Sequence, residues 1–149
     1  MFPNAKGSEL ISVLATVDPV SQGTGTVTTG WVFAGNHHNL MALLQTGTMS
    51  VSSTLDAKLQ QAMDSSGTSA KDITGKAITQ ITQVGSGSNK QAIINLRTDD
   101  LDLLNGFSYV RLSITVAAAA SLTAAQVLGV NPRFAPADSN NQAAVAQIV

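Results

Sequence analysis

The sequence contains no cysteine, which excludes a disulfide framework, a thiolate nucleophile and a cysteine-based zinc site. Its net charge of −1 provides no basic surface of the kind that binds nucleic acid, and little attraction to an anionic membrane. Residues Met1–Glu9 lack the basic and apolar regions of a signal peptide, and no apolar run is long enough to span a bilayer. We therefore expect no nucleic-acid partner, no membrane partner and synthesis in the cytoplasm.

Charge of either sign is scarce. Charged residues make up 11% of the 149 residues, whereas an average soluble domain has about 25%. Two interpretations follow: the isolated protein is poorly soluble, or partners cover much of its surface. Serine, threonine, asparagine and glutamine are abundant instead, and these uncharged polar side chains suit β-edges and wet interfaces, where a buried charge is costly.

Short segments with a period of two residues alternate with turn signals rich in glycine, serine and asparagine, a pattern typical of an all-β sandwich or barrel. The clearest predicted strand is Phe107–Ala117, which follows the turn residues Asn105 and Gly106. Seven other segments are predicted as strands: Glu9–Val17, Thr26–Phe33, Leu40–Gln45, Leu55–Met63, Lys76–Thr82, Lys90–Arg97 and Ala124–Val130. Eight short strands predict an all-β, jelly-roll-like antiparallel β-sandwich with extended N- and C-terminal arms.

Two segments also carry a helical signal. Residues Asp56–Met63 could form a short helix on propensity alone. Residues 98–104 begin with Thr98 as a candidate N-cap, followed by three acidic residues, which favours one helical turn.

The two ends differ from the middle of the chain. Residues 1–8 show no periodicity and predict an N-terminal arm, residues 9–130 the sandwich domain, and residues 131–149 a C-terminal arm rich in proline, alanine and asparagine. Such arms bury too little apolar surface to fold alone, so we expect them to become ordered on a neighbouring molecule.

No arrangement of residues predicts catalysis, a cofactor or a metal. Adjacent residues of a strand point to opposite faces, so His37 and His38 are interpreted as solvated or edge histidines and not as a metal pair, although a pH effect on assembly stays open. The acidic group Asp99, Asp100 and Asp102 lacks the spacing of a calcium loop and is interpreted as a solvated turn or helix cap. No hydrolase or phosphate-binding motif is present.

Aromatic residues are too scattered for a base-stacking platform. Trp31 is equally consistent with a core residue and with an interface anchor.

From Leu55 onward, about half of the chain resembles a group of small structural proteins of tailed phages, the capsid cement or decoration proteins. The resemblance is carried, in order, by Leu55–Gly67, Ala70–Ile81, Lys90–Arg97, Asn105–Leu112 and Val130–Pro136. It implies a jelly-roll fold, no enzymatic activity and a place on the exterior of the virion capsid. The implied partners are the major capsid protein and further copies of this chain, as a dimer or trimer assembled in the host cytoplasm.

In this interpretation the protein bridges capsomers, and its many copies turn weak contacts into strong attachment. The expected interface residues are Trp31, Arg97, Arg111, Arg133 and Phe134, although each arginine is equally consistent with an ordinary surface charge. Two alternatives remain open: a tail, neck or receptor-contacting virion protein, and a carbohydrate-binding sandwich, for which the sequence offers few aromatic residues.

Overall fold

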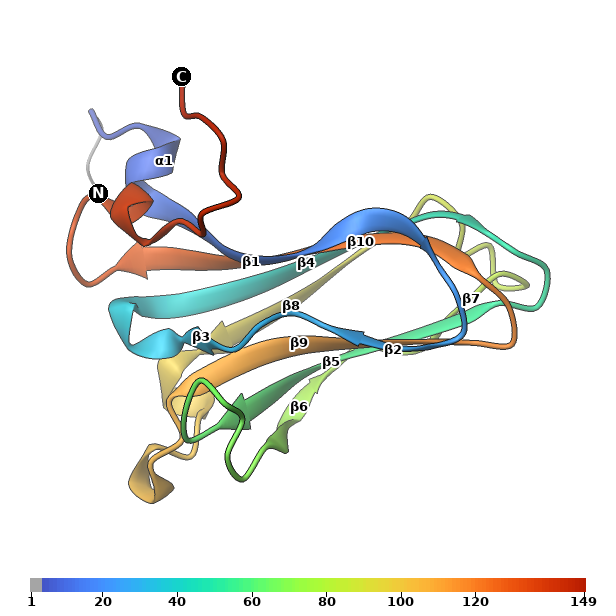
Figure 1. Ribbon diagram of the computed structural model, residues 1–149, viewed down its shortest axis with the longest axis horizontal. Coiled ribbons are helices and arrows are strands. Elements are labelled where there is room, and N and C mark those ends of the chain that lie inside the picture. Colours follow the sequence, from blue (N-terminus) through green and yellow to red (C-terminus); the bar gives the residue numbers. More distant parts are fainter. Residues whose placement is uncertain (1–3) are drawn as a thin grey trace.

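The computed structural model describes residues 4–149 as two antiparallel β-sheets packed face to face (Figure 1). Sheet A has the strand order β1 (Ile11–Gln22), β10 (Ser121–Pro132), β4 (His37–Met49) and β8 (Gln91–Arg97). Sheet B has the order β2 (Gly25–Thr28), β9 (Tyr109–Ala117), β5 (Thr54–Ala62) and β6 (Lys71–Ala77). Two short strands complete sheet B, β3 (Val32–Phe33) beside β9 and β7 (Ile81–Thr82) beside β5.

This strand order is that of a jelly roll. With β2 and β3 taken as one crossing of the sheet, and β6 and β7 as another, the first strand of the chain pairs with the last, β1 with β10, and the second with the second last, β2 with β9. The third pairs with the sixth, β4 with β8, and the central pair is β5 with β6. Two interlocked Greek keys give this nesting. The predicted all-β, jelly-roll-like antiparallel sandwich is confirmed.

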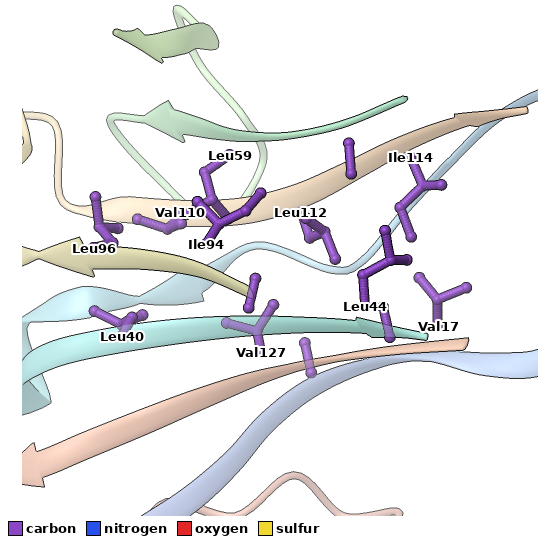
Figure 2. Close-up of a cluster of buried hydrophobic side chains, with 14 of the residues drawn as sticks. Val17, Leu40, Leu44, Leu59, Ile94, Leu96, Val110, Leu112, Ile114 and Val127 are labelled. Atoms are coloured by element: carbon purple, nitrogen blue, oxygen red, sulfur yellow. The ribbon is translucent and has the colours of Figure 1, made fainter. Parts of the chain in front are cut away.

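The core lies between the two sheets and is built from alternate residues of each strand (Figure 2). From sheet B, β9 contributes Val110, Leu112 and Ile114, each with 0% of its surface exposed. From sheet A, Leu40 and Leu44 of β4 face them and are equally enclosed (Figure 2). Each such side chain contributes roughly 1.5–3 kcal/mol on removal from water, which makes this layer the main source of stability.

Most strand predictions are confirmed, with shifted ends. The segment from Leu55 is the strand β5 and not a helix, because its alternate residues Leu55, Ala57 and Leu59 are buried against sheet A. Two predictions are wrong in their bounds because the segments are split. Lys76–Thr82 is divided between β6, which ends at Ala77, and β7. Thr26–Phe33 is divided between β2, which ends at Thr28, and β3. Only Ile73 of β6 is buried, so the sequence has no apolar alternation that would mark the start of this strand at Lys71.

The helical signal at residues 98–104 is met by two short turns. Residues Thr98–Asp100 form a 3₁₀ turn, η2, which confirms the predicted helical turn; its N-cap is Arg97, whose backbone N–H donates to Asp100. A further turn, η3 (Leu103–Asn105), ends at Gly106 with φ of +83°. The prediction that Thr98 itself caps this turn is wrong, since Thr98 is the first residue inside it.

Both ends of the described chain lie at the same end of the sandwich (Figure 1). A four-residue helix, α1 (Gly7–Leu10), leads directly into β1, and residues 1–3 of the expected N-terminal arm lie outside the described residues. After β10 the chain forms a 3₁₀ turn, η4 (Ala137–Asn140), which contacts β1 and α1. Within the C-terminal segment, residues 133–149, the part from η4 to Gln142 thus packs on the outer edge of sheet A.

Candidate interaction surface

The outer face of sheet A is a nearly uncharged surface. Cross-strand pairing aligns its outward residues in rows, such as Val13, Leu128, Met41 and Asn95 across the four strands. The other rows complete a set that we call the uncharged face: Ile11, Val130, Asn39 and Arg97; Thr16, Gln126, Leu43 and Ile93; and Ala124, Gln45 and Gln91. Arg97 is its only ionisable member and stands at one corner of the sheet.

The amino-acid pattern of these strands explains the character of the face. In β4, Leu40–Leu44 is a continuous apolar run, and β8 has a similar run at Ala92–Ile94. Strands that are apolar on both sides are typical of sheets covered on both faces, whereas a sheet with one solvated face alternates. Ile93, on the edge strand β8, is nevertheless 55% exposed. The strands of sheet A therefore have apolar runs typical of a sheet that is covered on both faces. In the isolated chain, however, much of the outer face is open to solvent.

The C-terminal segment covers one part of this face. The backbone N–H of Gln142 donates to the Val13 carbonyl at 2.8 Å, and the Val13 N–H donates to Asn141 Oδ1 at 2.7 Å. These bonds close the exposed edge of β1 for one residue. Beyond them, Gln142 and Ala144 border a shallow hollow on the uncharged face. The hollow continues over Leu43 and other residues of that face: Thr16, Gln45, Ala124 and Gln126. Asp18 of β1 also borders the hollow, and its Oδ1 accepts a hydrogen bond from Thr16 Oγ1 at 3.3 Å.

The outer face of sheet B is polar and makes most of its contacts with itself. Lys58 Nζ and Asp72 Oδ2 form an ion pair at 2.7 Å, and Gln60 Nε2 donates to Asp72 Oδ1 at 2.8 Å. Arg111 Nε then donates to Gln60 Oε1 at 2.9 Å. The strands below show clean alternation, with buried leucines between these polar residues. Sheet B is thus an ordinary half-solvated sheet.

Trp31 lies in this polar region, in the connection between β2 and β3. The Arg111 guanidinium carbon stands 4.4 Å from the centre of its ring, in a cation–π arrangement. Gly67 backs the same ring: its φ is +85°, and a Cβ there would lie 2.6 Å from Trp31 Nε1. Two of the expected interface residues, Trp31 and Arg111, therefore contact each other on the outer face of sheet B, and Trp31 is half-buried by its own chain.

The other three expected interface residues lie at the end of the sandwich where β8 and β10 finish. Arg97 is exposed and its Nη2 is 3.8 Å from Asp100 Oδ1. Arg133 Nη2 donates to Thr98 Oγ1 at 3.3 Å, which ties the C-terminal segment to the residue after Arg97. The next residue, Phe134, is 79% exposed. The five residues thus form two groups on different sheets and not one patch.

The apolar members of the uncharged face were not among the residues expected from the sequence. Leu43, Leu128 and Met41 lie in segments that the sequence predicts only as strands, with no assigned face. The signal that could have found them is the continuous apolar run in β4, because it exceeds what a half-solvated strand needs.

His37 corrects another expectation. It is fully buried, and not a solvated or edge histidine, while its neighbour His38 is exposed, so the opposite orientations are confirmed. The ring fits because Gly129 lies opposite: a Cβ at that position would be 2.5 Å from His37 Nε2. Burial lowers the pKa of His37 below its ordinary value of 6.5.

Four aspartates have lowered pKa values, for local reasons. The Lys58 ammonium lowers the pKa of Asp72, and the Lys76 ammonium, 2.9 Å away, lowers that of Asp100. The pKa of Asp102 is lowered by its bond to Lys71, and that of Asp64 by the Thr68 hydroxyl within its own turn. These are ion pairs and turn contacts at the surface, and none of them lies on the uncharged face.

Between residues 4 and 149, no group of three or more histidine, cysteine, aspartate or glutamate side chains is placed to hold a metal ion. Over the same residues, no helix has the length and apolar character needed to cross a membrane.

Comparison with known proteins completes the description. No protein-family model matches the sequence, and no curated protein matches it. Among solved structures, the chain is similar to a protein in the cryo-EM structure of broad bean stain virus, with 12% identity, a TM-score of 0.49, and 88% of this chain and 91% of that one covered. It is also similar to an empty virus-like particle protein of cowpea mosaic virus, with 10% identity, a TM-score of 0.44 and coverage of 88% and 85%. A third is from infectious bursal disease virus, Gt strain, with 12% identity and a TM-score of 0.42; the match covers 85% of this chain and 33% of that one.

Proposed function

We propose that the protein is a non-enzymatic structural component of a virion, a cement protein that binds the outer surface of the major capsid protein shell and bridges its capsomers. The observation that carries the proposal is the uncharged face of sheet A. The sequence resemblance to phage decoration proteins points to the same function.

The uncharged face supports binding to a protein partner. Leu43, Met41 and Leu128 are only half-buried in the isolated chain. The surrounding outward residues include five amides: Asn39, Gln45, Gln91, Asn95 and Gln126. An interface core is poor in charge and rich in apolar side chains, while amide groups at its rim hydrogen-bond to the partner or to trapped water. Two charged residues would accompany such an interface: Arg97 at the corner, and Asp18, which borders the hollow and accepts a hydrogen bond from Thr16. Arginine is the charged residue that interfaces favour.

The architecture agrees with this proposal but does not assign it. Jelly rolls occur in viral capsid domains, in lectins and in cupins, so the fold alone leaves several functions open. The outer side chains of sheet B already form ion pairs and hydrogen bonds with one another, so they are less available to a partner than those of sheet A. The interface with the shell is therefore assigned to sheet A.

The test is co-sedimentation of the purified protein with expanded capsid shells that lack it, followed by heat disruption of the shells. We expect saturable binding at a stoichiometry set by the symmetry axes, and shells that resist a higher temperature once loaded. Binding to purified tails or to host surface glycans, with none to shells, would contradict the cement function and favour the tail or receptor-contacting alternative.

A further inference from the structure

A buried hydrogen-bond relay connects the C-terminal segment to the middle of sheet A. Ser12 Oγ lies 2.6 Å from the Ala137 carbonyl oxygen and 3.0 Å from His37 Nε2. The Ser12 hydroxyl has one proton, and the carbonyl can only accept it, so Ser12 donates to Ala137. Ser12 must then accept a hydrogen bond from His37, which requires a proton on Nε2; in the neutral ring this leaves Nδ1 without a proton.

The other ring nitrogen of His37 has no partner. His37 Nδ1 is buried and makes no hydrogen bond with any of the residues 4–149. Protonation would place a second N–H there, together with a positive charge, where neither water nor an acceptor can reach it. A buried donor without a partner and an unpaired buried charge are both strongly unfavourable.

No neighbouring charge compensates for that cost. The ring makes no ion pair within the described part of the chain, and its only hydrogen bond is to Ser12. β10, which lies opposite it, carries no ionisable side chain. The ionisable groups on the other elements around it, none of which bonds to the ring, are Asp138 of η4, Glu9 of α1, Asp99 and Asp100 of η2, Arg133 and the adjacent His38.

The segment that covers the relay is the part of the molecule that can leave at least cost. Ala137 is fully buried over Ser12, but the residues just before it, Arg133–Pro136, are exposed. The remaining attachments are hydrogen bonds. Asn36 donates to Asn140, Arg133 donates to the Asn36 carbonyl and to Thr98, and Asn141 and Gln142 bond to β1. Segments with few buried apolar contacts open locally while the rest of a domain stays folded.

We propose that His37 is a pH-sensitive latch: neutral, it holds the C-terminal segment on β1 through Ser12, and protonated, it releases that segment. Burial keeps the pKa of His37 below its ordinary value while the segment is docked. The docked state therefore binds fewer protons than the open state, and docking weakens as the pH falls below about 6.5. In that window, each pH unit shifts the docking equilibrium by up to about tenfold.

Release would also uncover part of the uncharged face, because Gln142 and Ala144 border its hollow over Leu43. This consequence, regulation of shell binding by the segment, rests on the proposed function; the latch itself does not.

The experiment places a fluorinated label on an introduced cysteine, Ala144→Cys, which is unique because the sequence has no other cysteine. Fluorine NMR of the isolated protein then gives the docked and released populations between pH 7.5 and 5.5. We expect release on acidification in the otherwise unchanged protein, and none in His37→Gln, which keeps an N–H donor but does not titrate. His38→Gln, the exposed neighbour, is the matched control and should behave as the parent does.

A docked population that is constant over this range, or equal pH dependence in His37→Gln, would overturn the latch. So would a simultaneous change in Trp31 fluorescence, because it would mean that the whole domain unfolds. If His37→Gln does not fold, ring nitrogen NMR of the unsubstituted protein decides: the Nε2–H neutral tautomer at pH 7 supports the latch, and the Nδ1–H tautomer overturns it. No shells are used, so failure of shell binding and failure of the latch give separate results.

Discussion

The two sheets of this sandwich share one core but differ in the surface that each presents. The strands of sheet B contain the ionisable residues Asp56, Lys58, Lys71, Asp72, Lys76 and Arg111, whereas those of sheet A contain, besides two histidines, only Asp18 and Arg97. Sheet B alternates cleanly and bonds to itself on the outside, whereas the outer face of sheet A carries apolar and amide side chains with little charge. The few charged residues of the strands therefore lie mainly on sheet B, and the outer face of sheet A has very few. We infer that a partner binds to sheet A.

The largest expected effect comes from placing a charge on the uncharged face. Ile93→Lys changes a side chain that is 55% exposed, so the fold should tolerate it. In a covered interface the new ammonium would be unpaired and desolvated, and we expect shell binding to weaken about a hundredfold. The matched control is Thr28→Lys on β2, an exposed position of sheet B, which should bind shells as the parent protein does. Equal losses from both variants, measured by co-sedimentation, would erase the distinction between the sheets.

A smaller effect, on stability and not on binding, is expected from acid. The lowered pKa values of Asp72 and Asp100 belong to ion pairs with lysines of sheet B. Because the folded state binds these protons less tightly than the unfolded state, the stabilisation is present above the ordinary aspartate value of 3.8 and is lost as the pH falls below it.

Urea unfolding at pH 7 and pH 3 measures this loss. Asp72→Asn should lower the unfolding free energy at pH 7 by less than about 1 kcal/mol, since the Lys58–Asp72 pair is about half exposed, and should reduce the pH dependence. Asp18→Asn, on sheet A, is the control: Asp18 forms no ion pair within residues 4–149, and we expect its replacement to lower the unfolding free energy at pH 7 less than Asp72→Asn does. A larger effect from Asp18→Asn than from Asp72→Asn would show that the electrostatic stabilisation is not concentrated in sheet B.

The sequence predicted much of the fold because alternation is a local signal. In β9 and β5 the apolar residues recur every second position, and both segments were predicted as strands. β6 was placed wrongly since its only fully buried side chain is Ile73, so it has almost no periodicity to read. Strand ends were shifted elsewhere for the same reason.

The candidate surface was less predictable, because it depends on which strands become neighbours. Trp31 and Arg111 are 80 positions apart, and nothing local in the sequence brings them together. The burial of His37 likewise depends on Gly129 and Ser12, from two other strands. The continuous apolar run in β4 is visible in the sequence. That it forms part of a wide apolar surface depends on its neighbours β10 and β8, which the sequence does not identify.

The central claim is tested most directly by introducing cysteines into the protein and measuring how far binding to the shell protects them from alkylation. Ile93→Cys on sheet A and Thr28→Cys on sheet B each give a single thiol in a chain that has no other. Alkylation rates are measured for the free protein and for the protein bound to shells. We predict that binding slows alkylation at position 93 by more than tenfold and leaves position 28 unchanged. Unchanged reactivity at position 93, or protection at position 28 alone, would contradict the assignment of the uncharged face as the binding surface.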